Sequence, residues 1–137
     1  MELDITDTQP KEGFVEACII KFPSDYVGKW QYHQKGFNEH LEFIGRGTLT
    51  IEFSNFHRLS ERILTLGAKD SAKLNMPYLL VHRIKSGFDG AEIRASFMEE
   101  YNPEREPQFD TEEEAFCSLG RHLVEEFKPR RIDDDIQ

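Results

Sequence analysis

The sequence predicts an α+β fold, a single antiparallel sheet of four to five strands with two helices packed on one face. Three observations lead to this prediction. Several segments have the composition of strands, two carry apolar residues at helical spacing, and the regular strand–helix alternation of a parallel sheet is missing. At 137 residues the chain is long enough for one domain with its own core. We expect a flexible segment or edge strand over residues 1–12, a single α+β domain over 13–128 and a flexible acidic tail over 129–137.

The first firm element is a strand over Phe14–Phe22, which is rich in β-branched and aromatic residues and is bounded by Gly13 and Pro23. Its continuous apolar run, Ala17–Ile20, predicts a central strand that lies under a helix. Residues 23–36 show no clear period and are expected to form a loop or a short helix.

Two strand segments follow, Glu39–Ile44 and Thr48–Phe53. In the second, Leu49, Ile51 and Phe53 alternate with polar residues, which indicates a half-buried strand. The Gly-Arg-Gly of residues 45–47 predicts either a tight turn between two strands or a bulge that bends one long strand.

A first helix is expected over Phe56–Leu66. Asn55 can cap its free amides, and Gly67 provides a stop. The apolar stripe has spacings of three, four and three residues, as one helix face requires, and consists of Phe56, Leu59, Ile63 and Leu66.

The clearest hairpin joins Tyr78–Lys85 to Ala91–Met98, because Asp89-Gly90 favours a tight turn with positive φ. A second helix opens at Asp110 and ends before Pro129. Its start offers two capping boxes, Asp110 with Glu113 or Thr111 with Glu114, and its core stripe is Phe116, Leu119, Leu123 and Phe127.

Charge is distributed unevenly along the chain. The last 39 positions hold thirteen of the 26 acidic residues but only five of the 17 basic ones, which gives them −8 of the total charge of −9. This bias argues against nucleic-acid and membrane partners and favours a basic protein partner.

No motif for a cofactor or for nucleophilic catalysis is present, so we expect no cofactor and no enzyme. The chain lacks GxGxxG, GxxxxGK[ST], GxSxG, HExxH and CxxC. Cys18 and Cys117 both lie in apolar patterns and are predicted to be reduced, buried and inert. A polar N-terminus and the lack of a long apolar run predict a cytoplasmic protein.

The segment 26–37 interleaves aromatic and cationic residues. Trp30 and Tyr32 could anchor a protein partner, stack nucleic-acid bases or simply cap the core. Of the two binding alternatives we favour the protein partner, because the net charge opposes nucleic acid.

The acidic third of the chain offers a second binding surface, although its charges could equally be helix-start and solubilising residues. The leading hypothesis is a non-enzymatic, acidic protein-binding module. In its most concrete form it is an inhibitor or immunity-type protein that masks a basic, nuclease-like toxin. Its binding residues are Trp30, Tyr32, Glu99, Glu100, Glu104, Glu106, Glu112, Glu113 and Glu114.

Two alternatives stay open. His40 and Glu42 share a strand face that His33 could approach, so the chain could be a small enzyme or a metal-binding or ligand-binding domain with an open sheet face. The third alternative is a homo-oligomeric accessory subunit, such as a homodimer, joined through an exposed strand edge.

Overall fold

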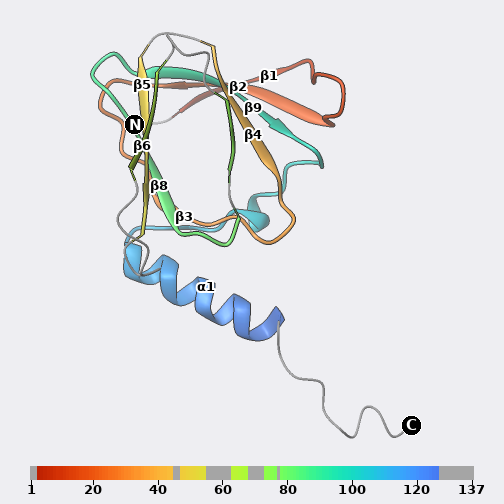
Figure 1. Cartoon of the computed structure of the whole chain (residues 1–137), viewed down its shortest axis with the longest axis vertical. Coiled ribbons are helices and arrows are strands. Elements are labelled where there is room, and N and C mark those ends of the chain that lie inside the picture. The colour runs from red at the N-terminus through yellow and green to blue at the C-terminus, as the bar shows by residue number, and fades with distance from the viewer. Residues whose placement is uncertain (1–2, 45–46, 55–62, 68–72, 77, 127–137) are drawn as a thin grey trace, which may run out of the picture.

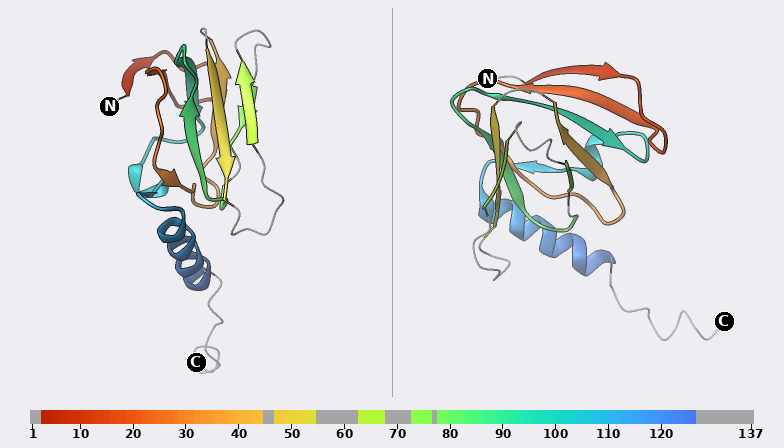
Figure 2. Two further views of the ribbon diagram at one scale, coloured as in Figure 1. Left: turned by 90° about the vertical axis from the view of Figure 1, so that its left-hand side faces the viewer. Right: turned by 45° about the horizontal axis from the view of Figure 1, so that its top comes forward.

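The chain folds into two antiparallel sheets that face each other, with one helix at the end of the sandwich (Figures 1 and 2). The computed structural model describes residues 3–44, 47–54, 63–67, 73–76 and 78–126. The first sheet has the strand order β1-β2-β9-β4-β7 and the second the order β10-β3-β8-β5-β6. The bounds in the first sheet are β1 Asp4–Thr8, β2 Glu16–Phe22, β9 Ala91–Phe97, β4 Glu39–Phe43 and β7 Lys73–Asn75. Those in the second are β10 Gln108–Phe109, β3 Trp30–Gln31, β8 His82–Ser86, β5 Thr48–Phe53 and β6 Ile63–Gly67.

The core lies between the sheets and follows the period-two alternation of the strands. In β4, Leu41 and Phe43 are buried, whereas His40 and Glu42 between and beside them point to the outer face. Leu49 and Ile51 of β5 are fully buried from the other side. The two inner faces therefore form one apolar cluster.

The predicted α+β class is wrong, since the described residues contain two sheets and one α-helix rather than one sheet and two helices. The prediction of a helix over Phe56–Leu66 is wrong for the part of this segment that the structure describes. Ile63–Gly67 is strand β6, which pairs with β5 in the register Thr50↔Thr65, and residues 55–62 lie outside the described residues. The β-branched residues Ile63 and Thr65 favour a strand, and pairing with β5 outweighs the helical spacing of the apolar residues.

The predicted hairpin is also wrong. Strand β8 lies in the second sheet and β9 in the first, so the turn at Asp89-Gly90 carries the chain across the sandwich. The link from β4 to β5 crosses in the same way. The two segments that cross between the sheets pack closely at Gly47 and Gly90. A Cβ on Gly47 would lie 1.9 Å from the Gly90 carbonyl oxygen. Both residues have positive φ, 102° and 70°, which glycine tolerates.

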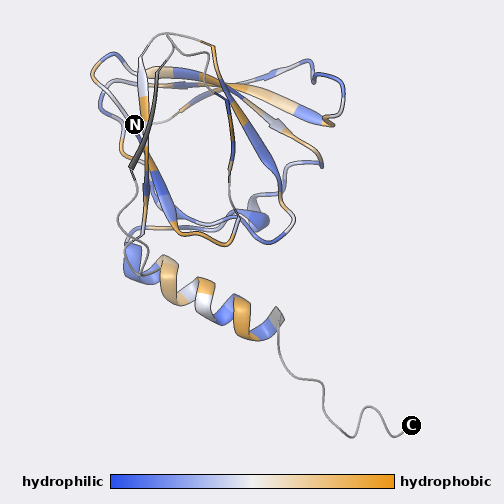
Figure 3. Ribbon diagram, in the orientation of Figure 1, coloured by the Kyte–Doolittle hydropathy of each residue, from blue (hydrophilic) through white to orange (hydrophobic). Residues whose placement is uncertain are grey.

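Helix α1, Glu112–Glu126, covers one end of the second sheet (Figure 1). Of the two predicted capping boxes, the structure forms the one at Thr111, whose Oγ1 accepts from the backbone N–H of Glu114 at 3.1 Å. Apolar and polar residues alternate along the helix (Figure 3), and Ala115 and Leu119 bury against Trp30 and Tyr32. The helix packs near β3 and β10, and no helix among the described residues covers β2 as predicted.

The two ends of the chain differ in what is described. Strand β1 is the edge strand of the first sheet and pairs with β2 in the register Thr6↔Ile19. Residues 127–137, which include the predicted acidic tail, lie outside the described residues. No helix in the described part of the chain is long and apolar enough to cross a membrane.

Candidate metal centre and adjoining cavity

Three side chains that could ligate a metal converge inside the sandwich. His33, Glu39 and Glu106 each offer one ligand atom, and these atoms all lie within 4.8 Å of one another. His33 Nε2 is 3.9 Å from a carboxylate oxygen of Glu106. The three residues come from three separate parts of the chain.

Strand pairing explains why they meet. Strands β3 and β10 pair in the register Gln31↔Gln108, and the backbone N–H of Gln34 donates to the Arg105 carbonyl three residues further along. His33 and Glu106 thus lie opposite each other just beyond the ends of the two strands. Glu39 is the first residue of β4, and its side chain lies on the buried face of that strand, as do those of Leu41 and Phe43. It therefore approaches His33 and Glu106 from the first sheet.

The cluster is buried, and among the described residues its histidine ring has no hydrogen-bond partner. His33 is 1% exposed, Glu39 9%, and the Glu106 side chain 11%. In the part of the chain that the structure describes, neither ring nitrogen of His33 has a hydrogen-bond partner. A buried polar side chain without a partner is costly, so the His33 ring nitrogens favour a hydrogen-bond partner or an ion.

Burial also changes the proton affinities of the three groups. Desolvation, with a smaller contribution from His82, lowers the pKa of His33 to about 3. Desolvation raises the pKa of Glu106 to about 7, and desolvation together with the charge of Glu106 raises the pKa of Glu39 well above its usual value. Without a cation the cluster therefore favours a neutral histidine and disfavours the ionisation of both carboxyl groups together.

A divalent cation fits this donor set. A neutral imidazole nitrogen and two carboxylate oxygens are ligands that zinc and other transition metals accept. Two atoms that each bind one ion at about 2.2 Å lie at most roughly 4.4 Å apart. The 3.9 Å between His33 and Glu106 already meets this limit, and the 4.8 Å spread of the cluster needs only a small contraction.

A line of hydrogen bonds lies beside the cluster. His82, which is fully buried, has its ring 5.3 Å from the ring of His33. Its Nδ1 donates to the carbonyl of Leu80 at 2.8 Å, so its Nε2 carries the lone pair and accepts from the side-chain amide of Gln31 at 3.4 Å. The Gln31 oxygen in turn accepts from the Gln108 amide at 3.4 Å.

A cavity of about 230 Å³ adjoins the cluster, with Glu39 and Glu106 in its wall. The remaining wall is largely apolar and comes from both sheets. It includes Ile20, Phe22, Ile84, Ile93 and Phe97. The structure therefore joins a possible metal site to a space that could hold a small molecule.

Of the predicted alternative trio His33, His40 and Glu42, only His33 belongs to the cluster. His40 Nδ1 is hydrogen-bonded to Asn75 Oδ1 at 2.7 Å, and Glu42 is paired with Lys11 at 2.9 Å, both on the outer face of the first sheet. The sequence reasoning missed Glu39, although its place in the apolar phase of β4 was a usable signal. It counted Glu106 as a surface residue, since no local pattern connects it with His33.

The two aromatic residues predicted to bind a partner lie in the interior. Trp30 is 8% exposed and Tyr32 3%, both under α1. The guanidinium of Arg83 covers the Trp30 ring at 4.6 Å. The core-capping alternative for these aromatics describes this arrangement.

The acidic residues predicted to bind a partner do not all lie on the surface. Glu106 is in the buried cluster, Glu112 accepts a hydrogen bond from Ser54, and Glu99 lies 3.7 Å from Arg105. The exposed ones are Glu100, Glu104, Glu113 and Glu114.

Comparison with known proteins places the fold. No family model and no curated protein sequence matches the chain. Among solved structures, the capsular polysaccharide assembling protein CapF from Staphylococcus aureus aligns with 80% of this chain at a TM-score of 0.64 and 10% identity. A variant of the oxalate decarboxylase from Bacillus subtilis aligns with 90% at 0.58 and 16% identity, and the Cnp3 cupin domain from Schizosaccharomyces pombe with 69% at 0.51 and 11% identity. The aligned part is 32%, 37% and 59% of those chains, so this chain matches about a third of CapF.

The chain is therefore a cupin-like β-sandwich. The leading sequence hypothesis, an acidic inhibitor or immunity-type protein that masks a basic toxin, is wrong. The fold with its internal His–Glu cluster supports the alternative of a metal-binding or ligand-binding domain instead. The physical reason is burial, because Trp30, Tyr32 and Glu106 face the protein interior.

Proposed function

We propose that this domain binds a divalent metal ion at His33, Glu39 and Glu106 and holds a small molecule in the adjoining cavity. The observation that carries the proposal is His33, a fully buried histidine whose two ring nitrogens have no partner among the described residues and which faces two buried carboxyl groups. A cation would satisfy the imidazole lone pair and would allow both carboxyl groups to ionise.

Three protein ligands leave coordination positions open to solvent or to a bound molecule, as catalytic rather than purely structural sites do. A bound metal would supply Lewis-acid polarisation of a ligand oxygen. The chain's own residues would hold that molecule, since the wall is largely apolar and Glu39 and Glu106 line the same cavity. One structural neighbour, the oxalate decarboxylase, is an enzyme, which gives a reason to assay the domain for catalysis. The sequence-based expectation of no enzymatic activity stays a prediction.

Metal content provides the direct test. The chain is purified without a polyhistidine tag, stripped with EDTA, and titrated separately with Mn²⁺, Co²⁺ and Zn²⁺ in a calorimeter, with elemental analysis of the dialysed complex. We expect one ion per chain. His33→Ala should abolish binding, and Glu106→Gln should weaken it by at least about tenfold, because it removes a charged ligand and keeps the side-chain shape.

His40→Ala is the matched control, because His40 is the outward-facing histidine that the sequence nominated. This variant should bind the ion as the parent does. Circular dichroism verifies that each variant is folded. A parent that binds no ion, or a folded His33→Ala variant with full affinity, would refute the proposed centre.

A further inference from the structure

Two glutamines are among the polar residues that line the cavity. Gln31 and Gln108 are register partners on β3 and β10, and both line the cavity. Each is two residues away from a proposed metal ligand, His33 and Glu106 respectively. Residues two apart on a strand are about 6.8 Å apart, so one small molecule can reach both the metal site and the glutamine pair.

The hydrogen bonds among His82, Gln31 and Gln108 determine which donors and acceptors of the two glutamines remain free for a ligand. Gln31 uses its oxygen for Gln108 and one N–H for His82. Gln108 uses one N–H for Gln31, which leaves its oxygen and a second N–H for a ligand. Gln31 likewise keeps its second N–H, so the glutamine pair presents two donors and one acceptor, all uncharged. That pattern complements a carboxamide group, which carries one of each.

The charges around the cavity select against anions. The described lining residues include four carboxyl groups, from Asp7, Glu16, Glu39 and Glu106, and a single cation, Lys29. That cation lies 3.4 Å from Asp110, so its charge is shared with a carboxylate outside the lining. An anionic ligand would therefore meet the carboxyl groups of Asp7 and Glu16, which the proposed metal does not take up.

A cationic ligand is disfavoured for a different reason. Glu39 and Glu106 are taken up by the metal, and Glu16 accepts the backbone N–H of Tyr101 at 2.6 Å. What is left for the body of a ligand is the apolar wall around Ile84 and Ile93. Burying an unpaired charge against such a wall is costly.

The volume limits the size of the molecule. An engineered apolar cavity of roughly 150 Å³ holds benzene. The 230 Å³ here therefore has room for one aromatic ring with a short polar substituent.

We propose that the cavity takes an uncharged small molecule with an apolar body and a carboxamide-like head that binds Gln31 and Gln108. This inference rests on the proposed function for the position of the metal beside the head group. The preference over an anion is expected without metal, because a bound cation would attract an anion. The preference over a cation is expected with metal, which takes up Glu39 and Glu106.

Three probes with the same benzyl body test the proposal, namely phenylacetamide, phenylacetate and phenethylamine. Their dissociation constants are measured by ligand-observed NMR at a pH where the acid and the amine are ionised. Phenylacetate is compared with the amide on the EDTA-treated protein, where no metal attracts it, and phenethylamine on the metal-loaded protein, where the metal occupies Glu39 and Glu106. We expect phenylacetamide to bind at least about tenfold more tightly than either charged probe, because only the amide pairs both polar groups without burying a charge. Equal or tighter binding of phenylacetate or phenethylamine overturns the inference.

Gln108→Leu removes the donor and acceptor at a partly exposed position and is expected to weaken phenylacetamide binding about tenfold while the metal content stays at the parental value. Gln9→Leu, in an exposed loop outside the cavity, is the control and should change neither. Unchanged amide binding in Gln108→Leu also overturns the inference. If the parent binds no metal and still prefers the amide, the proposed metal centre fails and this inference stands.

Discussion

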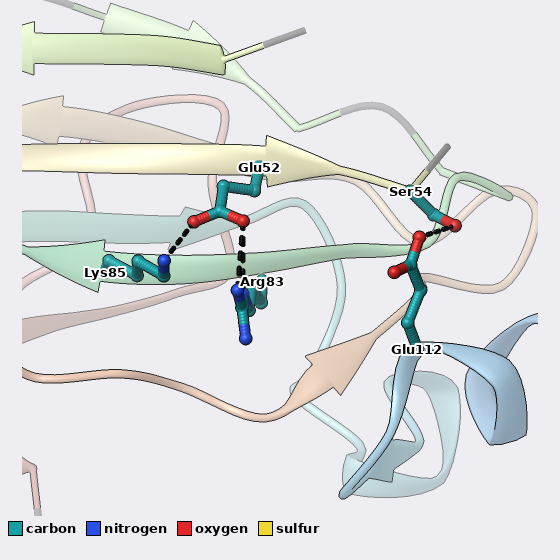
Figure 4. A network of polar contacts seen from close by, with 5 residues as sticks. All are labelled: Glu52, Ser54, Arg83, Lys85 and Glu112. Atoms are coloured by element: carbon teal, nitrogen blue, oxygen red, sulfur yellow. Dashed lines mark hydrogen bonds and ion pairs between the residues drawn. The ribbon is translucent and has the colours of Figure 1, made fainter. Parts of the chain in front are cut away.

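The hydroxyl of Ser54 donates to a carboxylate oxygen of Glu112 at 2.6 Å and so connects the end of β5 to the first turn of α1 (Figure 4). Ser54 is 2% exposed, and its backbone N–H donates to the Val81 carbonyl at 2.8 Å, which holds the hydroxyl in place. The other described contacts between helix and sandwich are largely apolar and centre on Ala115 and Leu119. The Ser54–Glu112 bond and the 3.0 Å hydrogen bond between the Tyr32 and Ser118 hydroxyls therefore both hold the helix in place over the sandwich.

Ser54→Ala should lower the free energy of unfolding by about 1.5–3 kcal/mol, because it removes a buried hydrogen bond to a charged group. Urea denaturation monitored by Trp30 fluorescence gives the value. Glu113→Ala is the control, since Glu113 is exposed in the same helical turn and should cost no more than about 0.5 kcal/mol. A double-mutant cycle with Glu112→Ala should show coupling, and strictly additive effects would mean that the bond contributes nothing.

The crossing between the sheets should not tolerate a side chain at Gly47. An added Cβ would lie 1.9 Å from the Gly90 carbonyl oxygen, and the positive φ of 102° adds strain. Gly47→Ala should therefore cost about 3 kcal/mol or more, the range of overpacking with backbone strain. Gly13→Ala separates the two causes, because Gly13 also has positive φ but has nothing within 4 Å of its Cβ position. The control should cost only about 1–2 kcal/mol, and equal losses would show that the crossings do not pack closely.

The ion-pair cluster on the outer face of the second sheet should make a small, pH-dependent contribution to stability. Burial raises the pKa of Glu52, but hydrogen bonds from Lys85 and Arg83 outweigh it, so the pKa lies below its usual value of 4.5 (Figure 4). Arg83 lies 3.1 Å from the carboxylate. A lowered pKa stabilises the fold at pH values above 4.5, and this stabilisation is lost as the pH falls through the pKa of the folded state.

Glu52→Gln should accordingly reduce stability by less than about 1 kcal/mol at pH 7, because the partners are partly exposed and water screens the pair. The difference from the parent should shrink as the pH is lowered below 4.5. Urea melts of both proteins at about pH 7 and about pH 3.5, on either side of this value, provide the comparison. A difference that grows on acidification would contradict the lowered pKa.

The strands were largely predictable from local patterns, but their partners were not. Phe14–Phe22, Glu39–Ile44 and Thr48–Phe53 were expected as strands, and β2, β4 and β5 occupy these segments. The alternation in a strand shows that one face is buried, but it does not show whether a second sheet or a helix covers that face. The turn at Asp89-Gly90 reverses the chain equally well within a sheet and between two sheets. These two ambiguities are the reason why the predicted fold class was wrong.

The site was predictable only in part, for a related reason. His33 was selected as a candidate. Glu39 could have been predicted as well, because it lies on the same strand face as the apolar residues Leu41 and Phe43. An acidic residue in an apolar phase is a strong sign of a function, since its burial is costly. Glu106 gave no comparable sign. It joins the cluster only through the pairing of β10 with β3, which depends on the whole fold.

The two cysteines should differ sharply in reactivity. Both were predicted to be buried, but Cys117 is exposed on α1 and only Cys18 is partly buried, in the cavity wall. Burial first, and then nearby carboxylates, raise the pKa of Cys18 to about 11, so very little thiolate is present at neutral pH. We expect iodoacetamide at about pH 7.5 to modify Cys117 in the native protein and both cysteines in urea, as peptide mass spectrometry would show. In the Cys117→Ser control, native labelling should nearly disappear. Rapid labelling of Cys18 in that variant would show that the cavity wall does not suppress its thiolate.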